Sequence, residues 1–133
     1  MIAVDSSVVI AACASWHESH PAALRAFERN PRLIGHCALE AYSVLTRLPG
    51  AQRVPSALVV EFLRDRFPHE PLVLSAAELR ELVGELHQRG IAGGAVYDAI
   101  VAMSARAHGA ELVSLDRRAA ETYRRCEVAY RLL

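Results

Sequence analysis

Three of the four aspartates in this chain lie beside apolar segments, in positions typical of strand ends and helix starts. Asp5 follows the apolar residues 1–4, Asp116 follows residues 112–115, and Asp98 stands within the run 97–101. Open α/β sheets bind their ligands at the carboxyl ends of strands. A carboxylate beside apolar segments costs free energy unless its charge is compensated. We therefore interpret these aspartates as candidate ligands of a hard divalent cation.

Each aspartate also has an alternative interpretation. Asp5 and Asp116 precede short helical patterns, so either could be an ordinary helix N-cap. Asp98 is less easily explained in that way, because its helical neighbours at i+3 and i+4 are Val101 and Ala102. The favourable dipole of a helix start explains part of its placement. It does not explain why a charge shares an apolar face.

Glu40 is a fourth candidate acid. In residues 39–45 it shares a helical face with Val44 and Leu48. By contrast, Glu78 and Glu81 belong to an ordinary solvated stripe on another expected helix. Two-metal phosphoryl chemistry requires several carboxylates around cations about 3.5–4 Å apart. Mg²⁺ accepts oxygen ligands, and a cluster of carboxylates without metal should raise at least one carboxyl pKa.

Several polar residues near these acids are candidate substrate contacts. Ser6 and Ser114 could orient a water or contact a phosphate, or could equally be a cap and a strand hydroxyl. Arg47 and Arg117 could offset the repulsion between the phosphates of a substrate and the acids, or could be exposed charges at helix ends. We interpret His36 as a core or substrate-rim histidine rather than a catalytic base.

Composition predicts one soluble domain spanning residues 1–133, since 53% of the residues are hydrophobic. Net charge is zero, which gives no general attraction to nucleic acid or anionic lipid. The basic residues are all arginine, a usage that coding bias explains as well as phosphate binding does. Three widely spaced cysteines favour a reduced, cytoplasmic protein. We expect no signal peptide, membrane span, zinc ribbon or disulfide framework.

Apolar runs alternate with helical patterns, which predicts an α/β fold with a mostly parallel sheet. Strands are expected at residues 1–4, 33–37, 72–74 and 111–115, with a possible fifth at 127–130. Helices are expected at residues 6–14, 20–29, 38–48, 56–66, 95–107 and 117–124. Residues 75–78 form a capping-box pattern that begins a further helix ending at Gly90.

Four short stretches together resemble PIN-domain ribonucleases, and more narrowly the VapC toxins of bacterial toxin–antitoxin pairs. They are residues 3–7 (AVDSS), 39–48 (LEAYSVLTRL), 93–100 (GGAVYDAI) and 112–116 (LVSLD). The resemblance implies a three-layer α/β/α fold with a central sheet of four to five strands. It implies that Asp5, Glu40, Asp98 and Asp116 are the catalytic and metal-binding acids, for Mg²⁺ or Mn²⁺. It also places Ser6 and Ser114 where the family often has serine or threonine.

The same resemblance implies an endoribonuclease that hydrolyses RNA with a metal-activated water, leaving a 5′-phosphate and a 3′-hydroxyl. The expected partners are the RNA substrate, a second copy in a homodimer, and a small antitoxin that inserts a segment into the acidic groove. Several family members carry a further acid shortly after the fourth one. This chain has Arg117 and Arg118 there, so it lacks the further acid that would help to hold a second metal.

Two other functions are alternatives. A phosphoaspartate-type phosphotransfer domain would also place an aspartate after its first strand, but such proteins use a lysine, and this chain has none. The related phosphatase pattern requires a second aspartate where Ser7 stands. A P-loop enzyme is excluded for lack of the glycine-rich loop and its lysine. A non-catalytic PIN-fold module that binds RNA or protein is the other alternative, and the intact acids argue against it.

Overall fold

The computed structural model describes residues 1–133 as one four-stranded parallel sheet between helices. The strands are β1 (Ile2–Val4), β2 (Arg32–Leu33), β3 (Glu111–Ser114) and β4 (Tyr130–Leu132). Their order across the sheet is β2-β1-β3-β4, and every pair is parallel. The central strands are buried on both faces, since Ala3, Val4, Leu112 and Val113 have no exposed surface. This explains why these strands are continuous apolar runs and do not alternate.

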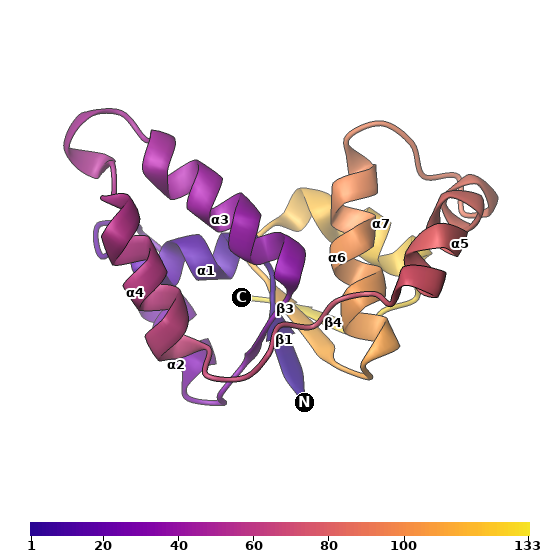
Figure 1. The fold of residues 1–133 in the computed structure, drawn as a ribbon, viewed down its shortest axis with the longest axis horizontal. Helices are drawn as coiled ribbons and strands as arrows, with labels where there is room; N and C mark the ends of the chain where they lie inside the picture. The colour runs from indigo at the N-terminus through magenta and orange to yellow at the C-terminus, as the bar shows by residue number, and fades with distance from the viewer.

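Seven α-helices flank the sheet, and together they make the three-layer α/β/α fold that the sequence predicted. They are α1 (Ser6–Cys13), α2 (His20–Phe27), α3 (Gly35–Arg47), α4 (Ser56–Arg66), α5 (Ala76–Gln88), α6 (Ala95–Ala107) and α7 (Ala120–Arg125). Two 3₁₀ turns, η1 (Gly50–Gln52) and η2 (Arg117–Ala119), complete the elements. Figure 1 shows α1 to α4 on one side of the strands and α5 to α7 on the other.

The topology places two candidate acids at one edge of the sheet. From β1 the chain crosses to β2 on one side, and it later returns to place β3 on the other side of β1. The carboxyl ends of β1 and β3 therefore form the point where strand order reverses, which is where open α/β sheets bind ligands. Asp5 directly follows β1, and its N–H donates to the carbonyl of Val113 in β3. Asp116 follows β3 after one intervening residue.

The expected strand at residues 33–37 is wrong beyond its first residue. β2 ends at Leu33 and α3 begins at Gly35, so His36 and Cys37 lie in the first turn of a helix. The N–H of Gly35 donates to the carbonyl of Leu72, where the segment after α4 crosses the end of β2. A short apolar run buried at a strand–helix junction has no periodicity that separates the two states.

Two further strand boundaries differ from expectation. Residues 72–74 do not form a regular strand, because only Leu72 pairs, through an isolated bridge to Ile34. The last strand is Tyr130–Leu132, later than the expected 127–130, since Glu127 adopts a left-handed turn conformation with φ of 55°. That turn lets the chain leave α7 and pair with β3. None of the helices combines the length and the apolar character needed to cross a membrane.

Candidate active site

Asp5 is the most deeply buried of the four candidate acids, with 4% of its surface exposed. It is the N-cap of α1 and accepts a hydrogen bond from the N–H of Val8 at 3.3 Å. The cap interpretation is therefore correct, but it is not the whole environment. The hydroxyls of Ser7 and Ser114 also donate to its two carboxylate oxygens, and the Tyr123 hydroxyl donates to Oδ2 at 2.9 Å. A capping residue alone does not require three hydroxyl donors.

Burial controls the protonation of this group. It raises the pKa of Asp5, and the hydrogen bonds from Ser114, Ser7, Tyr123 and Val8 lower it again without cancelling the effect. The pKa of Tyr123 is also raised, first by burial and then by the negative charge of Asp5. Tyr123 consequently keeps its proton and remains a donor to Asp5 at neutral pH.

Hydroxyl groups tie the segment after β1 to the segment after β3. Ser114 is fully buried, donates to Asp5, and accepts the N–H of Asp116 at 2.9 Å. The Ser7 hydroxyl accepts the N–H of Leu115 at 2.9 Å. Ser114 thus lies beneath the surface as a support of two candidate acids. Ser6 is half-buried in the first turn of α1.

Asp98 is half-buried in the first turn of α6. Its pKa is raised, first by burial and then by the negative charges of Asp116, Glu40 and Asp5. The negative charges of the other three candidate acids therefore act on Asp98, although all four acids come from different segments of the chain. Arg118 partly opposes the effect and lowers the pKa. The apolar neighbours expected for Asp98 are present, because Val101 and Ala102 are buried.

Glu40 lies in α3 with 46% of its side chain exposed, and Val44 and Leu48, which the sequence placed on the same helical face, are half-buried. Its Oε2 is 3.8 Å from Nε2 of His36, one helical turn earlier. Asp116 is the N-cap of η2 and accepts the N–H of Arg118 at 2.9 Å. Its side chain is 33% exposed and also pairs with the Arg118 guanidinium at 3.4 Å. The cap interpretation of Asp116 is therefore also correct.

Cys37 is a buried thiol beneath these acids, which sequence reasoning did not identify. Its pKa is raised well above the usual value, first by burial and then by Asp5, Glu40 and Asp98. Cys37 was missed because the sequence predicted a strand at residues 33–37, whereas Cys37 lies in the first turn of α3. Ser7 and Tyr123 were missed as well. Ser7 stands inside the AVDSS motif and could have been found there, whereas nothing local to Tyr123 indicates a partner so distant in the chain.

No three histidine, cysteine, aspartate or glutamate side chains are placed so that they could hold a metal ion together. The donor set nevertheless has the right chemistry, because carboxylate and hydroxyl oxygens are the ligands of hard cations. A cation would also offset the repulsion that Asp98 experiences. The residues fit Mg²⁺ or Mn²⁺ by type, and the ligand set stays a prediction.

One cavity adjoins a candidate acid and marks where a substrate could approach. A cavity of about 330 Å³ adjoins Asp116 and is also lined by Ser7, His17 and Arg118. A larger one, of about 560 Å³, lies between α5 and α6 and includes none of the candidate acids. Arg47, near the end of α3, and Arg117, in η2, are both exposed.

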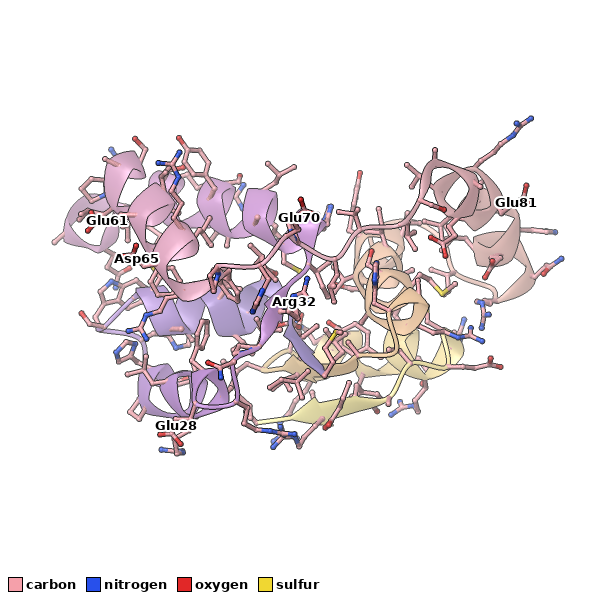
Figure 2. The ribbon with its side chains drawn as sticks, turned by 60° about the horizontal axis from the view of Figure 1, so that its bottom comes forward. Glu28, Arg32, Glu61, Asp65, Glu70 and Glu81 are labelled. Atoms are coloured by element: carbon pink, nitrogen blue, oxygen red, sulfur yellow. The ribbon has the colours of Figure 1, made fainter.

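The remaining acids behave as ordinary surface charges. Glu28, the C-cap of α2, Glu61 and Asp65 in α4, and Glu81 in α5 are exposed, and none of them lies in an element that carries a candidate acid. Figure 2 shows them projecting from these helices, with Arg32 directed toward the segment that carries Glu70. Nη2 of Arg32 donates to the carbonyl of Glu70 at 2.6 Å. These exposed acids therefore differ from Asp5, Glu40, Asp98 and Asp116, which remain the four candidate site residues.

Comparison with known proteins agrees with this site. The PIN domain family model matches residues 2–125. Ribonuclease VapC40 of Mycobacterium tuberculosis (strain H37Rv) is 46% identical over 133 residues, which cover 100% of this chain and 99% of the relative. Ribonuclease VapC27 of the same strain is 42% identical over 128 residues, covering 96% of this chain and 93% of the relative. The chain therefore belongs to the PIN-domain family, and within it to the VapC type, as the four sequence motifs predicted.

Proposed function

We propose that this chain is a metal-dependent endoribonuclease and the toxin of a toxin–antitoxin pair, with Asp5, Glu40, Asp98 and Asp116 as its catalytic and metal-binding acids. One observation carries the proposal: the pKa of the half-buried Asp98 is raised, after burial, by the negative charges of Asp116, Glu40 and Asp5, three carboxylates that come from separate segments of the fold. Such mutual repulsion destabilises a protein unless a cation offsets it. The likeness to two VapC ribonucleases supports the choice of RNA as substrate.

The placement of the residues supports the following roles. Asp5 is held by four donors and cannot easily turn, so it supplies a fixed oxygen toward the cation. Asp98, Glu40 and Asp116 are more exposed and supply the remaining oxygens. Bound Mg²⁺ or Mn²⁺ supplies the charge that polarises a phosphodiester and activates water for attack. Ser114 and Tyr123 orient Asp5, while Ser6, Arg47 and Arg117 contact RNA.

Conservative substitutions test the acids. Asp5→Asn and Asp98→Asn remove charge while keeping shape, and each should abolish Mg²⁺- or Mn²⁺-dependent cleavage of RNA, measured by electrophoresis of labelled RNA. Chelation with EDTA should have the same effect on the wild-type protein. Asp65→Asn is the matched control, because Asp65 is an exposed aspartate on α4. Cleavage that persists in both folded site variants would refute the proposed site.

A non-catalytic RNA- or protein-binding module is the second candidate. The observation in its favour is that no three candidate ligands converge, and that Asp5 and Asp116 both serve as caps. This candidate predicts RNA binding without cleavage in any divalent cation. The phosphoaspartate alternative has no lysine to contact a phosphate. It predicts an acyl phosphate on Asp5, which mass spectrometry after treatment with a phosphodonor would detect.

Partners and location form part of the proposal. We expect a cognate antitoxin that inserts a segment into the acidic groove, a homodimer, and a cytoplasmic location. The VapC-type relatives support the antitoxin, and the three free cysteines agree with a reducing compartment. Light scattering of the isolated protein tests the homodimer, and a monomer at all concentrations would refute it. Co-purification with the product of a neighbouring small reading frame, together with lost cleavage, tests the antitoxin.

A further inference from the structure

Two aromatic rings from different helices lie parallel beside the candidate acids. The His36 and Tyr97 ring centroids are 5.9 Å apart, and their planes differ by 10°. His36 is in the first turn of α3, and Tyr97 is in the first turn of α6. Each ring is linked to one acid, since Tyr97 directly precedes Asp98 and His36 is 3.8 Å from Glu40. The pair therefore joins the two helices that carry two of the four acids.

The exposure of the two rings is unequal. The His36 side chain is 28% exposed and lies near both Glu40 and the ring of Tyr97. Tyr97 is 63% exposed, more than any other tyrosine, tryptophan or phenylalanine in the chain. The His36 ring is stacked against one face of the Tyr97 ring, and we infer that the exposed surface of Tyr97 includes the opposite face. The hydrophobic core gains little from such a ring, and its position requires another explanation.

The other exposed aromatic residues lack this arrangement. Trp16 is 46% exposed, and its ring is tilted by 36° to that of His17. Tyr42 is 40% exposed and has no aromatic neighbour. Of the three, Tyr97 alone combines a parallel ring behind it with a direct chain connection to a candidate acid. These properties describe a flat surface held in a fixed orientation at the edge of the site.

We propose that Tyr97, supported by His36, is a stacking platform for a nucleobase of the RNA next to the cleaved phosphodiester. The inference rests on the proposed function and adds a residue that contacts the substrate. Stacking on an aromatic ring requires a base that is free of its own helix. It tolerates any base, because every base has a flat π face. It also adds affinity without charge, which suits a site whose own carboxylates repel phosphates.

The spacing of the rings determines where the base lies. Successive stacked bases are about 3.4 Å apart along a strand, so a base inserted between two rings needs roughly twice that separation. The His36 and Tyr97 centroids are only 5.9 Å apart, too close for insertion. The base therefore stacks on the free face of Tyr97, and His36 limits the motion of the ring from behind.

Binding and cleavage are measured separately. Short single-stranded RNAs of mixed sequence, each containing one 2-aminopurine, are titrated with protein in Mg²⁺. Every protein in this assay carries Asp116→Asn so that the RNA stays intact, which electrophoresis verifies. Tyr97→Ala should raise the Kd about fivefold or more and abolish the fluorescence quenching that stacking causes. Tyr97→Phe, which keeps the ring, should retain the Kd and the fluorescence quenching of the parent protein. Tyr97→Leu should lose the quenching.

Controls separate stacking from a structural role. Tyr42→Ala removes an exposed tyrosine of α3 and should leave the Kd unchanged. His36→Ala should weaken binding less than Tyr97→Ala does, because it frees the ring without removing it. Fully base-paired RNA should compete poorly with the single-stranded probes. Thermal unfolding tests whether each variant is folded. If Tyr97→Ala is not folded, Tyr97→Leu replaces it in the comparison.

The outcomes for the platform and for the nuclease are distinct. If Tyr97→Ala binds as tightly as its parent, or if the parent binds none of the RNAs, the platform is refuted. RNA cleavage by the wild-type protein would then still support the proposed function. Binding that depends on the Tyr97 ring, together with no RNA cleavage by the wild-type protein in Mg²⁺ or Mn²⁺, would support the platform and contradict the nuclease.

Discussion

The carboxylate of Asp5 shows how a single side chain can satisfy a structural and a chemical requirement together. It caps α1 through the N–H of Val8, and it also receives the hydroxyls of Ser7, Ser114 and Tyr123. Burial raises its pKa, and these donors limit the increase. A carboxylate held in this way keeps one orientation whether or not substrate is present. Orientation by surrounding donors is how proteins adjust the ligands of metal sites.

Tyr123→Phe tests this support at the residue scale. The change deletes only the hydroxyl that donates to Asp5 at 2.9 Å. We expect metal affinity or the rate of cleavage to fall about 10- to 100-fold, which is the usual effect of removing a residue that hydrogen-bonds to a metal ligand and orients it. The free energy of unfolding should fall by about 1–3 kcal/mol, because a buried acceptor loses a donor.

Tyr130→Phe is the control for this prediction. Its hydroxyl accepts a hydrogen bond from Nη1 of the exposed Arg124, and its ring packs edge-on against the ring of Tyr123. Metal titration followed by calorimetry, and urea unfolding, measure both effects. Equal metal affinity in the two variants would show that Tyr123 is only part of the core.

At the scale of elements, the site is held together by the two segments that follow β1 and β3. The strands pair in parallel, so their carboxyl ends meet at one edge of the sheet. Ser114 then connects them, because it donates to Asp5 and accepts the N–H of Asp116. Ser7 makes the reciprocal connection by accepting the N–H of Leu115. Moving either segment would disturb both acids.

Ser114→Ala should loosen this junction. The substitution leaves Asp5 without one donor and the N–H of Asp116 without an acceptor. An unsatisfied buried polar group costs about 1–3 kcal/mol, so urea unfolding should show a loss in that range. Ser104→Ala is the matched control, since its buried hydroxyl donates only to the carbonyl of Ile100 within α6. That bond is a back-bond to the preceding turn, and its loss should cost less.

Across the whole molecule, the four acids couple metal binding to stability. The pKa values of Asp5 and Asp98 are raised in the fold, so the folded state holds their protons more tightly than the unfolded chain does. The stability contributed by this difference is fully present below the ordinary pKa of 3.8. It is lost as the pH rises through the raised values. At neutral pH without metal, these carboxylates therefore oppose folding.

Asp98→Asn should consequently raise the melting temperature of the metal-free protein at neutral pH. The advantage over wild type should shrink as the pH falls through the raised pKa of Asp98, because the wild-type side chain then becomes neutral too. Added Mg²⁺ should stabilise the wild-type protein in proportion to its binding, and the variant less. Thermal unfolding at several pH values, with EDTA or Mg²⁺, measures both trends. A wild-type melting temperature that ignores Mg²⁺ would contradict a cation at these acids.

Much of the site could be anticipated from short segments of sequence. Asp5, Asp98 and Asp116 lie at the starts of helical elements, where local apolar runs and caps are readable. The alternation of apolar runs and helical patterns likewise predicted a parallel α/β sheet, because both periodicities are local properties of the chain. The capping box at Ser75 and Glu78 was predicted and is present for the same reason. The likeness to the PIN family rested on four such local motifs.

Tertiary packing decided what no local pattern could express. Tyr123 meets Asp5, and His36 faces Tyr97, only because α7, α3 and α6 pack around the end of the sheet. The start of α3 at Gly35 depends on the crossing segment at Leu72, so the expected strand there was mostly wrong. Periodicity reports which face of a segment is apolar. The partner of that face, and the residue at which a strand ends, follow from the contacts of the complete fold.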